Sequence, residues 1–143
     1  MKYRFLENVA IADTCFEAFG KSESELFENS ALAIAETMAE AKKVKPKEKR
    51  EIALEAKSLE QLLHDFLDEI VFLKDESGMV FSKFVVKVSK EKNSCKVKAQ
   101  IFGQKISGLG PKVLKTDVKA VTWHDFGIKK SGNNFVATVV LDV

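Results

Sequence analysis

Two aspartates stand in otherwise apolar segments near opposite ends of the chain. Asp13 lies within Val9–Gly20, and Asp142 is the penultimate residue of the stretch Asn134–Val143. A buried carboxylate is costly unless it is paired or bound to a metal. If the two strands are neighbours, both side chains and the terminal carboxylate of Val143 form an all-oxygen cluster suited to calcium, magnesium or manganese. Alternatively, each aspartate faces solvent at a strand end, and the spacing does not decide between these readings.

Lys119 and the two histidines are the other polar candidates. Lys119 interrupts an apolar run, so it is either a cation that holds a phosphate or steadies the acidic cluster, or a solvated lysine. His124 has no nearby histidine or cysteine in sequence, which argues against zinc, and we expect it to be partly buried in a strand with one hydrogen bond. His64 falls in a predicted helix, and we expect it at the surface or rim.

Motifs of an independent enzyme are missing. The glycines at 103, 108 and 110 lack the lysine-serine ending of a phosphate-binding loop, and no G-x-S-x-G elbow occurs. Neither Cys15 nor Cys95 has metal-ligand spacing, and we expect both to be buried free thiols. We therefore expect a protein that is not itself an enzyme.

The elements that must position these residues follow from periodicity and capping. Ser22 with Glu25, and Ser58 with Gln61, match the helix-capping box and precede apolar residues at helical spacing. The second stripe is heavier, so that helix should be covered on more than one side. Alternation predicts strands at residues 1–6, 9–20, 51–56, 79–88, 96–102, 116–126 and 134–143. The order is strand, helix, strand, helix and then four strands, an α+β fold with two helices packed on mainly antiparallel sheet.

Length and charge bound the class of protein. The 143 residues suit a single domain spanning 1–143, and 45% hydrophobic residues suffice for a core. With 23 basic and 21 acidic residues, the chain does not have the strongly basic character typical of nucleic-acid binding, so a role in RNA biology would run through a protein partner or a local patch. No signal peptide or membrane-spanning run is evident, so we expect a soluble, cytoplasmic protein with no membrane contact.

Several short segments resemble the archease family. They occur in the family's order and spacing over nearly the whole chain: Phe27–Ala33, Leu62–Glu69, Phe81–Phe84, Val118–His124 and the closing Leu141–Val143. The chain departs from the family before Asp13, where a segment close to D-H-T-A-D is replaced by the apolar residues Val9–Ala12 followed by Asp13.

The resemblance implies a role and a site. Archeases are accessory proteins that promote guanylylation and turnover of the RtcB-type RNA ligase, which joins tRNA exon halves, so the exon halves would be contacted only indirectly through the ligase. The family binds a divalent cation, recorded as calcium in some members, and the matching positions here are Asp13, Asp142 and Val143. Lys119 matches a further residue implicated in activity, where it would contact phosphate or the partner.

Two other classes of function remain open. A chaperone or solubility factor for an RNA-modifying enzyme, such as a methyltransferase, would need an exposed apolar patch rather than an acidic cluster. A metal-dependent hydrolase would need an acid–base pair, which the sequence does not offer.

Overall fold

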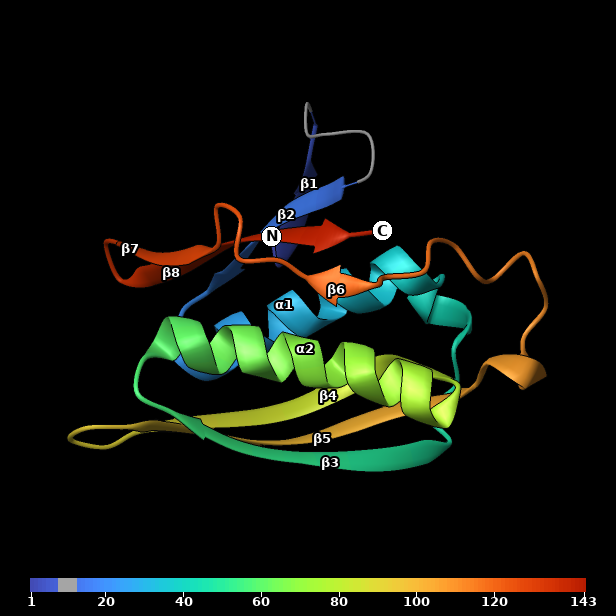
Figure 1. Ribbon diagram of the computed structural model, residues 1–143, viewed down its shortest axis with the longest axis horizontal. Helices are drawn as coiled ribbons and strands as arrows, with labels where there is room; N and C mark the ends of the chain where they lie inside the picture. Colours follow the sequence, from blue (N-terminus) through green and yellow to red (C-terminus); the bar gives the residue numbers. More distant parts are fainter. Residues whose placement is uncertain (8–12) are drawn as a thin grey trace.

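Two helices lie between two antiparallel sheets in the computed structural model, which describes residues 1–7 and 13–143. Figure 1 shows the five-stranded sheet above the helices and the three-stranded sheet below them. The predicted α+β fold is confirmed, and every strand pairing in the described residues is antiparallel. The division into two sheets, one on each side of the helices, was not predicted.

The five-stranded sheet contains both ends of the chain. Its order is β1-β2-β8-β6, and β7 pairs with the same edge of β8 further along. The strands are β1 (Tyr3–Leu6), β2 (Asp13–Gly20), β6 (Ala120–Val121), β7 (Gly127–Ser131) and β8 (Asn134–Asp142).

The three-stranded sheet is built from the middle of the chain. Its order is β3-β5-β4, with β5 in the centre. The strands are β3 (Glu48–Ala56), β4 (Met79–Lys90) and β5 (Cys95–Lys105), and short 3₁₀ turns η1 (Ala41–Lys43) and η2 (Ile106–Gly108) lie beside them in sequence.

Both helices begin at the predicted caps. Ser22 accepts a hydrogen bond from the backbone N–H of Glu25 at the start of α1 (Glu23–Met38), and Ser58 accepts one from Gln61 at the start of α2 (Leu59–Ser77). These bonds satisfy backbone donors that have no partner within the helix. α2 ends at Gly78, whose φ of 64° is a left-handed conformation that glycine adopts without a Cβ penalty.

The core is one contiguous cluster of apolar side chains contributed by both sheets and both helices. α2 packs against β3 and β5 on one side and against β6 on the other, which confirms that it is covered on more than one side. Phe27 of α1 and Phe66 of α2 meet in this cluster with ring centroids 5.5 Å apart.

The strand prediction was wrong in one region. Only Ala120–Val121 of the predicted strand 116–126 pairs with β8, and β7, at 127–131, was not predicted. Asp117 and Val118 are instead held from α2, as described below. The prediction that a strand begins at Val9 falls on residues 8–12 and lies outside the described residues. Cys15 and Cys95 are buried free thiols, as expected. No helix in the described part of the chain is long and apolar enough to cross a membrane.

Gly20 fixes the junction between β2 and α1. A Cβ at this position would collide with the backbone of Leu26 in the first turn of the helix. With glycine at position 20, the end of β2, the strand that carries Asp13, lies closer to α1 than any residue with a Cβ would allow.

We expect Gly20→Ala to lower the free energy of unfolding by about 1–3 kcal/mol, because backbone atoms must move to admit the methyl group. Gly110→Ala is the matched control, since its Cβ would meet no atom within 4 Å. That variant should be neutral or stabilising by up to about 1 kcal/mol. Urea denaturation measures both, and equal stability of the two variants would contradict the argument.

Candidate functional site

Asp13 and Asp142 lie directly opposite one another at the end of the β2–β8 pair. Directly opposed residues of antiparallel strands have Cβ atoms about 4.5–5.5 Å apart, and like charges at that separation destabilise the pair. Both residues are half-buried. The neighbouring strands on which the sequence argument depended are therefore present.

The alternation of β2 and β8 places the two carboxylates on the face that points away from the helices. Phe16 and Leu141 are fully buried on the helix-facing side. Asp13 shares the opposite face with Cys15, two residues along β2, and Asp142 shares it with Val140, the residue that pairs with Cys15. The aspartates are thus excluded from the main core by the same two-residue period that buries their neighbours.

An open cleft of about 670 Å³ adjoins this end of the sheet. Its lining includes Asp13 and Cys15 from β2, His124 and Asp125 from the loop after β6, and Lys129 of β7. Asp125 has a φ of 51°, the one left-handed non-glycine residue in the described part of the chain. Burial, together with Asp125 and Glu17, raises the pKa of the Cys15 thiol, which disfavours a nucleophilic thiolate here.

A backbone hydrogen bond places Lys119 beside the acidic pair. Its N–H donates to the carbonyl oxygen of Asp142 at 2.8 Å, and the next residue, Ala120, pairs with Asp142 in the sheet. The side chain of Lys119 is exposed. The structure therefore brings Asp13, Asp142 and Lys119 to one end of the five-stranded sheet, next to Val143.

The Archease protein family model matches residues 3–143. Curated archease proteins share 34% identity over 142 residues in Sulfurisphaera tokodaii, covering 99% of each chain, and 36% over 133 residues in Pyrococcus abyssi, covering 92% of this chain and 93% of that one. The chain belongs to the archease family.

Solved structures agree with this assignment. A solution structure from Methanobacterium thermoautotrophicum matches this archease with a TM-score of 0.86 and 32% identity, over 99% of this chain and 98% of the other. A crystal structure from Thermotoga maritima, described as an archease and possible chaperone, matches with a TM-score of 0.62 and 20% identity over 98% of both chains, which supports the fold alone.

At this end of the five-stranded sheet, Asp13 and Asp142 offer carboxylate oxygens as metal ligands. In residues 1–7 and 13–143, no three or more His, Cys, Asp and Glu side chains are grouped so as to hold a metal ion. Two opposed carboxylates nonetheless have the chemistry that a hard divalent cation prefers, and such a cation would relieve their repulsion. A site here would need further oxygen ligands beyond the two side chains.

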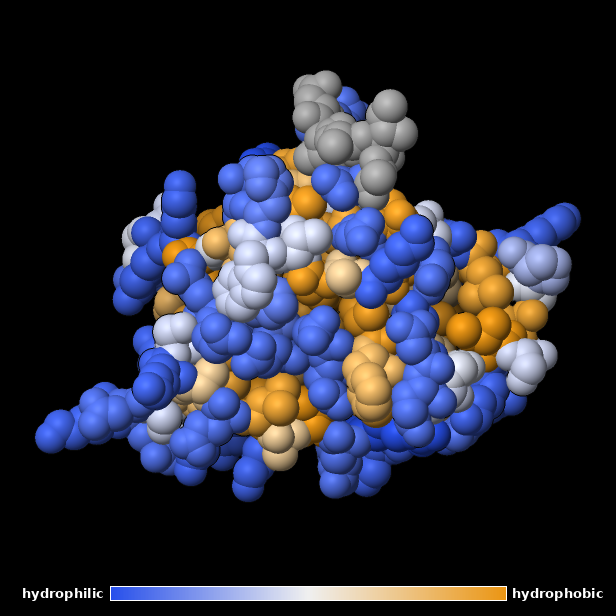
Figure 2. Space-filling view, viewed as in Figure 1, coloured by the Kyte–Doolittle hydropathy of each residue, from blue (hydrophilic) through white to orange (hydrophobic). Residues whose placement is uncertain are grey.

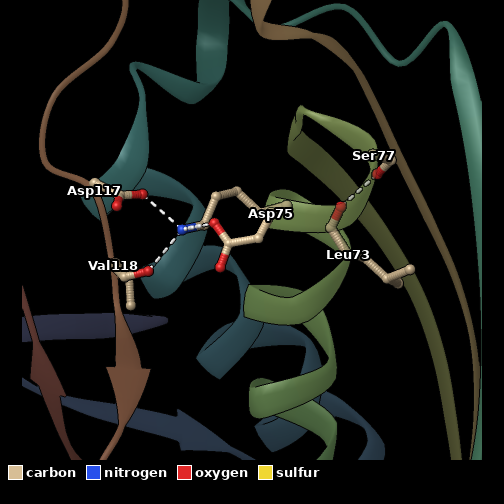
Figure 3. Close-up of polar contacts among 6 residues, drawn as sticks. Leu73, Asp75, Ser77, Asp117 and Val118 are labelled. Atoms are coloured by element: carbon tan, nitrogen blue, oxygen red, sulfur yellow. Dashed lines mark hydrogen bonds and ion pairs between the residues drawn. The ribbon is translucent and has the colours of Figure 1, made fainter.

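Lys74, a residue that the sequence analysis missed, fixes the segment that leads to Lys119. The Lys74 side chain on α2 is 5% exposed. Its ammonium donates to Asp117 Oδ1 at 2.6 Å and to the Val118 carbonyl at 2.7 Å, and it lies 2.7 Å from Asp75 Oδ1 (Figure 3). Burial by itself lowers the pKa of Lys74, but the hydrogen bonds to Asp117 and Asp75 outweigh it and raise the pKa above 10.5. Lys74 lies four residues after Ile70, on the apolar stripe of α2. A lysine at such a core position was the sequence signal that could have indicated a buried ion pair.

Both histidine predictions were wrong. His64 is buried and stacks on Trp123, with ring centroids 3.9 Å apart, because the β6 segment covers this part of α2. Its Nε2 lies 2.8 Å from the Val121 carbonyl, and since a carbonyl only accepts, Nε2 carries the proton. Within the described residues, the buried Nδ1 has no hydrogen-bond partner, and Asp65 Oδ1 lies 3.8 Å from it. His124 is exposed in a loop, 3.3 Å from Asp125, rather than partly buried in a strand.

We expect Lys74→Met to lower the free energy of unfolding at neutral pH by about 1–3 kcal/mol, because it removes charge-assisted hydrogen bonds. A raised lysine pKa contributes stability that is fully present below 10.5 and is lost as pH rises through the folded-state value. The difference between the native protein and Lys74→Met should therefore shrink above pH 10.5.

Urea denaturation from pH 7 to 11 measures this difference, with Lys47→Met, at an exposed position, as the control. A difference independent of pH would contradict a charged Lys74.

Proposed function

We propose that this archease is an accessory protein that activates an RtcB-type RNA ligase by promoting its guanylylation and turnover. The observation that carries the proposal is the cross-strand pair of Asp13 and Asp142 in a chain of this family. The chemistry of RNA joining would stay on the ligase, since burial raises the pKa of the Cys15 thiol at this site and disfavours a nucleophilic thiolate.

The chain's own residues would act as follows. Asp13, Asp142 and the carboxylate of Val143 would hold a divalent cation, calcium in the first instance and magnesium or manganese as alternatives. The cation would supply positive charge for phosphate or for a partner carboxylate. The exposed Lys119, which directly precedes β6, would contact the same phosphate or partner.

A cation at this site should stabilise the folded protein. Binding to the native state alone contributes RT ln(1 + [L]/Kd), about 2.7 kcal/mol at a cation concentration 100 times Kd. We expect calcium to raise the melting temperature of the native protein and to have little effect on Asp142→Asn. In the absence of cation, Asp142→Asn should be no less stable than the native protein, because it removes the repulsion with Asp13.

Differential scanning calorimetry with chelator, calcium or magnesium tests this prediction. Asp68→Asn, at an exposed position of α2, is the control for loss of one carboxylate. A calcium response retained in Asp142→Asn, or lost equally in Asp68→Asn, would remove Asp142 from the site.

Ligase activation is tested by multiple-turnover RNA ligation with the cognate ligase and guanosine triphosphate. The native archease should accelerate turnover and the formation of guanylylated ligase, whereas Asp13→Asn, Asp142→Asn and Lys119→Gln should lose most of that effect. Asp68→Asn should keep it. No acceleration under any of the three cations would refute the proposal.

A chaperone for an RNA-modifying enzyme is the second candidate. It is favoured by the description of the Thermotoga maritima protein and by the exposed aromatic side chains Phe72 and Trp123. Such a role should be insensitive to Asp142→Asn. Suppression of a client's aggregation that Asp142→Asn preserves, without any effect on the ligase, would favour this function.

A further inference from the structure

The three-stranded sheet covers the helices with one face and leaves its other face open (Figure 1). Paired residues of neighbouring strands share a face, so the register identifies the side chains on the open side. They form rows across the sheet: Lys49, Phe102 and Lys83; Glu51, Gln100 and Val85; Ala53, Lys98 and Lys87; and Glu55, Lys96 and Ser89.

This open face is strongly basic. Five lysines stand against two glutamates, although the chain as a whole has only 23 basic residues against 21 acidic ones. In Figure 2 the lower margin, where this sheet lies, is mostly hydrophilic. The balanced composition therefore conceals one concentrated patch.

Three of the lysines lack a carboxylate partner among the described residues. Lys49 pairs with Glu51 at 3.5 Å and Lys96 with Glu91 at 3.3 Å, whereas no ion pair is present for Lys83, Lys87 or Lys98 in that part of the chain. Lys87 and Lys98 are direct cross-strand neighbours. Like charges directly opposite destabilise a sheet, and an anion between them would reverse that effect.

Protection of sheet edges does not explain the pattern. Lysines on an edge strand prevent pairing with another chain, and this accounts for Lys49 on β3 and for Lys83 and Lys87 on β4. Lys96 and Lys98 are on β5, which is paired on both sides. Lys96 has the ion pair with Glu91, so Lys98 is the lysine of β5 that neither edge protection nor an ion pair among the described residues explains.

A shallow hollow of about 450 Å³ lies on the same face. Val85 and Ala53 contribute exposed apolar surface to it, and its polar lining is Lys87, Lys98, Gln100 and the carboxylate of Glu51, which pairs with Lys49. Val85 is 50% exposed. Beside the hollow, the Lys83 ammonium stands 5.2 Å from the centroid of the half-buried Phe102 ring. Apolar surface bordered by unpaired cations suits a base and its flanking phosphates.

We propose that the open face of the three-stranded sheet binds single-stranded RNA. Lys83, Lys87 and Lys98 contact successive phosphates, and a base lies in the hollow over Val85. This surface is formed by different strands from the acidic site, so the inference goes beyond the proposed function and does not depend on it.

Fluorescence anisotropy with the isolated protein and a labelled 12-nucleotide oligouridylate tests the proposal. Binding to single strands weakens with salt, with a slope of about −0.7 in log K against log salt for each phosphate neutralised. We expect Lys87→Gln/Lys98→Gln to weaken binding about tenfold at low salt and to reduce the slope by about 1.4, since two contacts are lost. Val85→Ser should weaken binding without changing the slope.

Lys42→Gln/Lys43→Gln is the matched control, because it removes the same charge from the exposed η1 turn. The control should bind like the native protein. Equal losses in both double variants would show non-specific attraction and overturn the proposal, as would no binding at low salt. Intact RNA binding by Lys87→Gln/Lys98→Gln, with weaker binding of the purified ligase, would make the face a protein-docking surface and would also overturn it.

Discussion

The antiparallel pairing of β2 with β8 is the constraint on which the acidic end of this archease depends. The two strands come from opposite ends of the chain, and their register places Asp13 opposite Asp142. A slip of one residue would exchange the two faces of a strand and carry its aspartate into the layer that contacts the helices. The register is held by apolar residues that include Phe16 and Val139, both fully buried, and a slip would expose them. The hydrophobic core therefore determines where the charges stand.

The fold was predictable where a local signal agreed with the tertiary structure. Both helix starts followed from serine caps, because an N-cap side chain bonds to an N–H three residues along whatever surrounds it. The strands of the three-stranded sheet followed from alternation, although the structure extends them. In the candidate site, Asp13, Asp142 and Lys119 lie close together, as the sequence analysis had considered. The division of the strands between two sheets was not predictable, because it depends on long-range pairing that periodicity does not encode.

The errors have one physical origin, the contact between α2 and the segment before β7. Residues 116–119 alternate Thr116 and Val118 with charged residues, which looks like a strand, yet Lys74 binds the Asp117 side chain and the Val118 carbonyl from the helix. The same contact buries His64 under Trp123 and leaves His124 outside. A lysine on the apolar stripe of α2 pointed to a buried partner, but nothing in the sequence named a partner 43 residues away.

The distribution of charge separates two kinds of chemistry that the net value of +2 hides. Carboxylates meet at the end of the five-stranded sheet, where the proposed cation would lie, and lysines meet on the open face of the three-stranded sheet. The two helices stand between the two sheets (Figure 1), and a helix layer alone is about 10–12 Å thick, which exceeds the 8–10 Å over which physiological salt lets exposed charges act on one another. Each surface can therefore attract a partner of opposite sign without neutralising the other. Under the two proposals, the protein would contact an enzyme and a polyanionic RNA at the same time, and the core between the two surfaces would keep these contacts at a fixed relative orientation.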